Sequence, residues 1–127
     1  MSGLIGGIVG KHLASLGHTI TALNRQSVDG YKTTQASITD FDAIRPAFDG
    51  IDTVIHLAAY LGPDDQAQLD INIEGTYNVF KAAGEAGVKR VIFGSSGATL
   101  MVSENYEPYK SFREGRMDDL PTPRPVM

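Results

Sequence analysis

Two glycines near the N-terminus lie in the stretch Gly3-Leu4-Ile5-Gly6. Glycines at this spacing suit the turn from a β-strand into a helix, where a backbone without Cβ can turn sharply and approach a phosphate group. The following helix would direct its first amides and positive dipole end at a pyrophosphate. No strand-like segment precedes Gly3. The stretch predicts a phosphate-binding loop without its first part; the alternative is a glycine-rich end that frays.

Polar residues also follow segments that read as strands. Asn24-Arg25 comes after an alternating Thr- and Ile-rich run, and Ser95-Ser96 comes after an apolar run. A serine pair at a strand end is commonly a turn former. Ligands of parallel α/β sheets bind beyond the carboxyl ends of the strands. Chemistry is therefore to be sought at these strand ends, although the residue types alone indicate no more than a turn at Ser95-Ser96.

The elements that would position these residues alternate between helix and strand. Apolar residues at helical spacing predict a helix over 4–16 that ends at Gly17 and buries one face. That face comprises Ile5, Ile8, Val9, Leu13 and Leu16. Strands are expected over 18–24 and 32–38, followed by a short helix over 41–48 that Thr39-Asp40 would cap.

The second half of the chain continues the alternation. The nearly continuous apolar run 51–59 predicts a strand covered on both faces, as in a parallel sheet. A helix over 66–86 and a strand over 88–96 follow, and from Glu104 the chain reads as a loop. The helix is expected to bury one stripe: Leu69, Ile73, Thr76, Phe80 and Ala83. The pattern predicts an α/β fold with a doubly wound, mostly parallel sheet over 1–103 and a loop or tail over 104–127.

Composition narrows the classes of partner. The net charge of −4 and pI near 5.2 provide no basic surface for nucleic acid or an anionic membrane, so neither partner is expected. Cysteine is absent, and the three histidines do not have the spacing of metal ligands, so no metal site is expected. Apolar stretches are short and no signal-peptide layout is present, which predicts a cytoplasmic protein.

Four short motifs occur in a defined order: SGLIG, HLAA, NIEGT and FGSSGAT. In this order they resemble the extended short-chain dehydrogenase/reductase family, the NAD(P)-dependent epimerases and dehydratases, over Ser2–Thr99. The resemblance implies a Rossmann-like domain. It places Gly3 and Gly6 on the second and third glycines of the family's T-G-x-x-G-x-x-G loop. The chain is therefore expected to be an N-terminal fragment that lacks the first strand.

The resemblance implies a set of cofactor contacts. Gly3, Leu4, Ile5 and Gly6 of the glycine loop would lie at the pyrophosphate. Asn24 and Arg25 would lie at the ribose, and Ser37 and Ile38 at the adenine. The family usually has Asp where this chain has Asn24-Arg25. Loss of a carboxylate and gain of a guanidinium favour NADP over NAD, because Arg can pair with a 2′-phosphate. The alternative that Arg25 is only a surface residue on a turn, with no role in cofactor binding, has equal weight.

Further residues acquire roles from the same resemblance. Leu57, Ala58 and Ala59 match the stretch that passes beneath the cofactor, and Asn72 matches an Asn that braces the neighbouring strand. Ser96 matches the catalytic Ser that polarises the substrate carbonyl or alcohol. Tyr106 and Lys110 fit the family's Y-x-x-x-K string. However, Pro108 disfavours a helix there, so they are not expected to be the catalytic pair.

The leading hypothesis is a fragment of an NAD(P)-dependent oxidoreductase, epimerase or dehydratase. Its small-molecule substrate would be a sugar nucleotide, a sugar acid or a similar hydroxyl or carbonyl compound, and the fragment alone is expected to be inactive. Alternatives are a nucleotide-binding regulatory, redox-sensing module and an inactive interaction fragment. A missing central strand would lie between the strands ending at Asn24 and Ala59. We expect those strands to pair directly or the chain to form homo-oligomers, with weak or absent NAD(P) binding.

Overall fold

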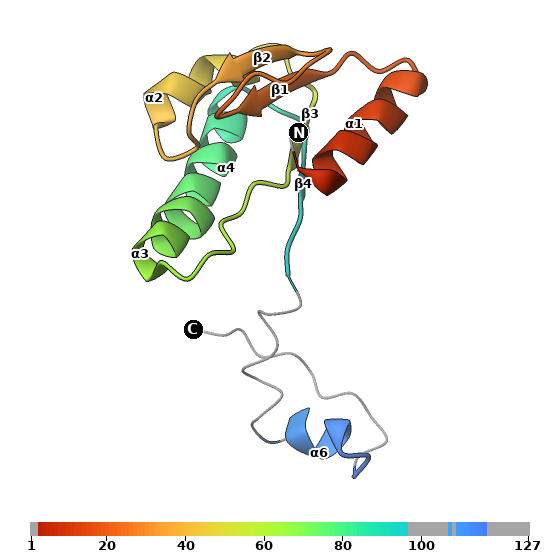
Figure 1. The fold of residues 1–127 in the computed structure, drawn as a ribbon, viewed down its shortest axis with the longest axis vertical. Coiled ribbons are helices and arrows are strands. Elements are labelled where there is room, and N and C mark those ends of the chain that lie inside the picture. The colour runs from red at the N-terminus through yellow and green to blue at the C-terminus, as the bar shows by residue number, and fades with distance from the viewer. Residues whose placement is uncertain (1–2, 97–106, 108, 117–127) are drawn as a thin grey trace. The chain divides into compact units, whose positions relative to one another are not determined.

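A computed structural model describes residues 3–96, 107 and 109–116. The chain divides into two compact units, 1–94 and 95–127. In the first unit, helices alternate with short strands, as Figure 1 shows. The elements are α1 (Leu4–Ser15), β1 (Thr21–Asn24), β2 (Lys32–Gln35), α2 (Phe41–Ile44), the 3₁₀ turn η1 (Arg45–Phe48), β3 (Thr53–His56), α3 (Asp65–Gln68), the π-helix η2 (Leu69–Gly75), α4 (Thr76–Glu85) and β4 (Arg90–Phe93).

Local sequence signals account for most of these boundaries. Asp40 Oδ1 accepts a hydrogen bond from the Ala43 amide at 3.1 Å and so caps α2, as expected. Asp64 caps α3 in the same way, accepting from the Ala67 amide at 3.0 Å. Gly17 follows α1 with a φ of 86°, a left-handed conformation that favours glycine. The predicted α/β alternation is thus present.

The strands form two separate parallel pairs. β1 pairs with β2, placing Thr21 opposite Lys32, and β3 pairs with β4, placing Thr53 opposite Arg90. Within the part of the chain that the structure describes, β1 and β3 do not pair. Direct pairing, the first of the two expected outcomes, is therefore not present among these residues, whereas the second, formation of homo-oligomers, stays a prediction. The expected strand over 51–59 is also shorter, since β3 ends at His56 and 57–59 is a loop.

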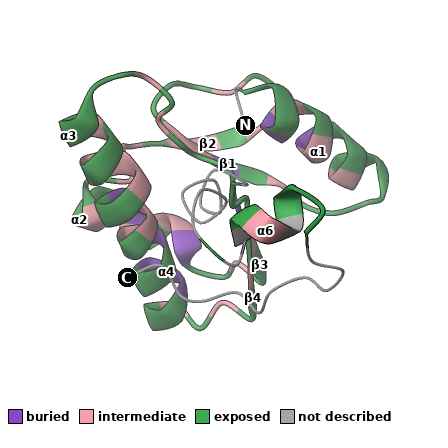
Figure 2. Ribbon diagram, turned by 90° about the horizontal axis from the view of Figure 1, so that it is seen from below, coloured by how far each residue is buried: buried purple, intermediate pink, exposed green. Residues whose placement is uncertain are grey.

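One hydrophobic core lies beneath both pairs of strands. Its fully buried members come from α2, η1 and α4, and are drawn in purple in Figure 2: Ile44, Phe48, Val79, Ala82 and Ala83. Leu23 of β1, Val54 of β3 and Val91 of β4 pack against them. The two sheets therefore share one helical layer, although no strand of the described residues joins them.

The buried faces of two helices differ from those expected. In α1 the buried residues are Gly6 and Gly10, whereas Ile5, Ile8 and the C-cap residue Leu16 are exposed. In the 65–85 helix the buried residues include Gly75, Val79, Ala82 and Ala83. Leu69, Ile73 and Phe80 are exposed. Ala83 is buried as expected, but the rest of the buried stripe runs through Gly75, Val79 and Ala82 instead of Leu69, Ile73 and Phe80.

The second unit contains a helix that the sequence did not predict, α6 (Tyr109–Arg113). Polar contacts rather than apolar periodicity accompany it, which explains why a periodicity search overlooked it. Among the helices described, none has the length and apolar character needed to cross a membrane.

Candidate functional site

The carboxyl ends of β1 and β2 are linked to each other. The Ala36 amide donates to the carbonyl of Asn24, the last residue of β1, at 3.1 Å. The Asn24 side-chain amide donates to the Gln26 carbonyl at 2.8 Å and so shapes the turn that carries Arg25. Arg25 is exposed. A guanidinium at this position can reach solvent or an anion beyond the strand end.

Ser37 closes a tight turn after β2. Its hydroxyl lies 2.8 Å from the Thr39 hydroxyl and accepts the Thr39 amide at 3.3 Å. The Asp40 amide donates to the Ser37 carbonyl at 3.0 Å. The Ser37 side chain thus stabilises its own turn, as short hydroxyl side chains do in loops.

Ile38, the next residue, is held by the long helix. The Asn78 side-chain amide donates to the Ile38 carbonyl at 3.0 Å. A Cβ at Gly75 would lie 2.6 Å from Ile38 Cγ1 and 2.7 Å from Cδ1. Only glycine at position 75 therefore lets the Ile38 side chain lie where it does.

His56 ends β3 and is 4% exposed. Its Nε2 is hydrogen-bonded to Thr76 Oγ1 at 3.0 Å, and its ring stacks on Phe93 with ring centroids 5.2 Å apart. Burial lowers the pKa of His56 below its ordinary value of 6.5. The ring is therefore neutral at pH 7 and braces β3 against α4 and β4.

The loop after β3 carries the small residues Ala58 and Ala59, which are exposed along with Leu57. The Gly94 amide donates to the His56 carbonyl at 2.9 Å, so the ends of β3 and β4 are joined. A Cβ at Gly94 would lie 2.9 Å from Leu57 Cδ2. The loop therefore presents small side chains and accessible backbone, which suits close approach of a flat ligand.

Asn72 holds the far end of that loop with both ends of its amide. Its Oδ1 accepts from the Tyr60 amide at 2.7 Å, and its Nδ2 donates to the Tyr60 carbonyl at 2.9 Å. Asn72 lies in the π-helix η2. Widened helical turns of this kind are frequent at functional sites. The expected bracing role of Asn72 stays a prediction, and this contact is its structural counterpart.

Gly3 and Gly6 occupy the first turn of α1. Gly3 is the N-cap and its carbonyl accepts from the Gly7 amide at 2.9 Å. Gly6 is buried, whereas Leu4 and Ile5 are exposed. Among the described residues, no hydrogen bond joins this turn to the loops after β2 and β3.

Several of the predicted site residues are thus hydrogen-bonded to a neighbouring element of the fold. Hydrogen bonds connect Asn24 to the β2 end, Ile38 to α4, and the Leu57–Tyr60 loop to η2. Ser96 is exposed and belongs to the second unit. Tyr106 lies outside the described residues, and Lys110 lies in α6.

The sequence analysis assigned no role in this site to four residues: Tyr60, Gly75, Thr76 and Asn78. Three of them lie within NIEGTYN, six residues or fewer from Asn72. Polar residues inside a helix have poor helical propensity, so their clustering was the available signal.

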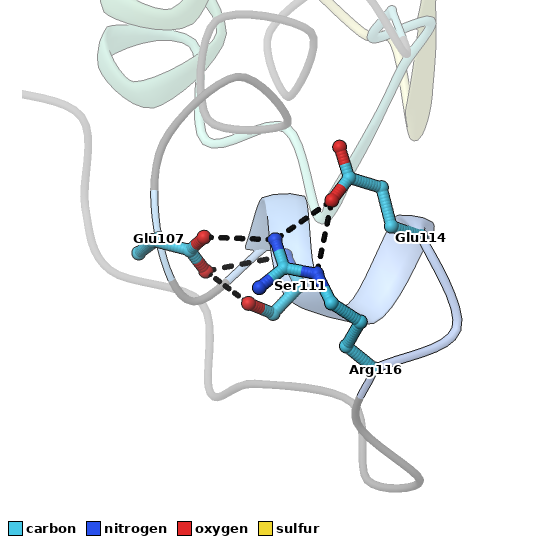
Figure 3. Close-up of polar contacts among 4 residues, drawn as sticks. All are labelled: Glu107, Ser111, Glu114 and Arg116. Atoms are coloured by element: carbon cyan, nitrogen blue, oxygen red, sulfur yellow. Dashed lines mark hydrogen bonds and ion pairs between the residues drawn. The ribbon is translucent and has the colours of Figure 1, made fainter.

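A separate polar cluster surrounds α6 (Figure 3). The Ser111 amide and hydroxyl both donate to Glu107 Oε2. Arg116 bridges Glu107 at 3.1 Å and Glu114 at 2.7 Å. The Ser111 hydroxyl bond, followed by the Arg116 contact, lowers the pKa of Glu107. The cluster satisfies its own charges and organises a short exposed helix. Among the described residues, no group of His, Asp and Glu side chains could hold a metal ion.

The sequence profile of the NAD dependent epimerase/dehydratase family matches residues 1–123. The chain is similar to an L-arabinose 1-dehydrogenase (NAD(P)(+)) of Haloferax volcanii, with 36% identity over 97 residues. That match covers 75% of this chain and 38% of the relative. An NAD-dependent glucose-6-phosphate dehydrogenase of the same organism is 37% identical over 105 residues, 78% of this chain and 40% of the relative. The chain thus spans about two fifths of the length of these relatives.

Solved structures share the fold. A short-chain dehydrogenase/reductase superfamily protein from Agrobacterium tumefaciens with bound NAD superposes with a TM-score of 0.72 and 29% identity. It covers 77% of this chain and 31% of that protein. The enzyme WbmG of Bordetella bronchiseptica, solved in complex with NAD, gives a TM-score of 0.69 and 30% identity, over 78% of this chain and 36% of that protein. The predicted Rossmann-like α/β fold is confirmed.

Proposed function

Because the chain belongs to the NAD-dependent epimerase/dehydratase family, we propose that it forms the dinucleotide-binding part of an NAD(P)-dependent oxidoreductase or epimerase. One observation at the carboxyl edge of the strands carries this proposal. There, side chains of one helix hold both the Ser37–Ile38 turn and the Leu57–Tyr60 loop. Ligands of open α/β sheets bind at this edge. When bound, the cofactor would supply the hydride chemistry.

Each segment of the edge has a proposed contact. The first amides of α1, from Gly3 to Gly6, would face the pyrophosphate. Asn24 and Arg25 would face the ribose, Ser37 and Ile38 the adenine, and Ala58 and Ala59 would pass beneath the dinucleotide. Arg25 favours NADP, because a guanidinium can pair with a 2′-phosphate.

Substrate and turnover are further parts of the proposal. Two relatives are named as dehydrogenases of L-arabinose and glucose-6-phosphate, which supports a sugar or similar hydroxyl or carbonyl substrate. Ser96 would polarise the reacting oxygen in the whole enzyme. His56 is buried and its Nε2 is engaged with Thr76, so the ring is not placed to reach a substrate and is not a candidate base. We infer that the chain alone binds cofactor weakly and catalyses no turnover.

The test is amide NMR of the 127-residue chain titrated separately with NAD and NADP. We expect weak binding, with dissociation constants on the order of 1 mM, and shifts at 24–25, 37–39 and 57–60. Arg25→Ala should weaken NADP about tenfold and leave NAD unchanged. Lys11→Ala, an exposed cation on α1, is the matched control. Shifts scattered over other surfaces, or none with either dinucleotide, would contradict the proposal. Tight binding by a compact monomer would favour the regulatory module instead.

A further inference from the structure

One helical segment, from α3 through η2 to α4, contacts the loops of both sheets. Asn78 donates to the Ile38 carbonyl after β2, whereas Asn72 binds the Tyr60 backbone after β3. Thr76 is bonded to His56 at the end of β3. Since no described strand joins the two sheets, these side chains are polar links between their carboxyl ends. The relative position of the two loops therefore depends on this helix.

Asn78 and Gly75 act on the same residue from the same helix. Asn78 fixes the Ile38 carbonyl, and the absent side chain of Gly75 makes room for Ile38 Cγ1 and Cδ1. Gly75 is buried and Asn78 is half-buried, so water competes little for these contacts. The main chain and the side chain of Ile38 are thus both located by the helix.

Hydrogen bonds within the turn that begins at Ser37 hold its residues together. The Ser37 hydroxyl is bonded to Thr39, and the Ser37 carbonyl accepts from the Asp40 amide. The turn is therefore a compact unit that moves with Ile38. A ligand group lying against it would meet backbone whose place is set by Asn78.

We propose that Asn78 is a positioning residue that, with Gly75, sets where the Ser37–Ile38 turn meets the adenine of the bound dinucleotide. This inference rests on the proposed function, because it assigns the adenine end of the same site. Asn78 itself acts through Ile38. Its effect should accordingly be confined to the adenine end of the cofactor.

The experiment compares Asn78→Asp with the unaltered chain. The substitution keeps the size of the side chain, removes the donor to the Ile38 carbonyl and places a carboxylate beside it. AMP and nicotinamide mononucleotide are titrated separately by amide NMR. AMP affinity should fall about tenfold while that of nicotinamide mononucleotide stays unchanged. Glu74→Gln, on the exposed side of the same helix, is the control and should leave both affinities unchanged.

Amide hydrogen exchange without ligand tests the positioning step on its own. The Asp40 amide, which donates to Ser37, should exchange about tenfold faster in Asn78→Asp. Unchanged AMP affinity, or equal loss for both mononucleotides, would overturn the inference. If the unaltered chain binds neither mononucleotide, the proposed function fails. The exchange rate of Asp40 then still decides whether Asn78 positions the turn: faster exchange supports it, and an unchanged rate overturns it.

Discussion

His56 combines burial with a lowered pKa and a hydroxyl partner. Its ordinary pKa is 6.5, and burial shifts the folded-state value below this. The unfolded chain therefore takes up the proton more readily than the folded chain. The neutral His56 ring contributes fully to folding stability at pH values above the pKa of the unfolded chain. This contribution is lost as the pH falls below about 6.5. The folded state should accordingly weaken in mild acid.

The prediction is that the free energy of unfolding decreases between pH 7 and pH 5, and that His56→Gln reduces this dependence. Glutamine remains neutral and can still hydrogen-bond Thr76 Oγ1. Thr76→Val should cost about 1–3 kcal/mol, because it leaves His56 Nε2 without its bond. Urea unfolding at several pH values is the measurement. An identical pH profile in His56→Gln would contradict the role assigned to this ring.

Glu107 provides a second titrating contact. The Ser111 hydroxyl and then Arg116 lower the pKa of this carboxylate below its ordinary value of 4.5. The contacts of the Glu107 carboxylate therefore stabilise α6 at pH values above its ordinary pKa. This stabilisation is lost as the pH falls through the lowered pKa of the folded state. We expect the Ser111 amide resonance to move with the Glu107 titration. In an NMR pH titration, Glu107→Gln should abolish the movement of the Ser111 amide resonance. Glu114→Gln should leave that movement in place.

Single residues were predictable where one physical requirement decided them. Asp40 caps α2 and Gly17 ends α1 because a cap needs a short acceptor and a left-handed turn needs glycine. Asn78 was not identified, because its role depends on Ile38, forty residues away along the chain. The polar stretch NIEGTYN marks Asn78 as unusual inside a helix, but its partner is set by tertiary packing and cannot be read from that stretch.

Among the elements, the helical segment over 65–85 shows best what the sequence could and could not predict. The existence and extent of the helix over 65–85 were close to expectation. Its buried face was only partly as expected, because Ala83 is buried whereas Phe80, in the same α-helix, is exposed. Phe80 was expected in the core but instead packs edge-on against Phe93, with centroids 5.9 Å apart.

Two glycines on this helical segment give a matched pair of substitutions. Gly75→Ala would place a methyl group 2.6 Å from Ile38 Cγ1, and should destabilise the fold by about 1–3 kcal/mol. Gly84 has no atom within 4 Å of an added Cβ, so Gly84→Ala should stabilise the fold by about 0.5–1 kcal/mol through helix propensity. Chemical denaturation of both variants is the measurement. Equal effects of the two would show that the Ile38 contact is unimportant.

For the whole molecule, the fold class followed from the order of helix and strand patterns, because each crossover in a parallel sheet needs an intervening connection. The pairing of β1 with β2 and of β3 with β4 involves neighbours in the chain and agrees with that order. β1 and β3 do not pair among the described residues, although both sheets pack on one helical layer. Leu23, Val54 and Val91 are already packed on that layer, which fixes the position of both sheets.

Apolar side chains on α1 lead to a prediction about assembly. Leu4 is 83% exposed, Ile5 and Ile8 are each 63% exposed, and Leu16 is 61% exposed. Apolar groups gathered on one helix are uncommon on the surface of a monomer. β1 and β3 each also have one edge without a partner strand within the described residues. We therefore expect the chain to self-associate as its concentration rises.

Sedimentation velocity over a wide range of concentrations measures this association. Ile5→Lys combined with Ile8→Lys should weaken it at least about tenfold, since burial of each such side chain contributes about 1.5–3 kcal/mol. Lys11→Gln, a polar change on the same helix, is the control and should leave the association constant nearly unchanged. A compact monomer at every concentration would contradict the prediction. In that case the apolar face of α1 would remain in water, and the Lys substitutions would leave both sedimentation and stability nearly unaltered, because exposed positions away from packing contribute within about 0.5 kcal/mol.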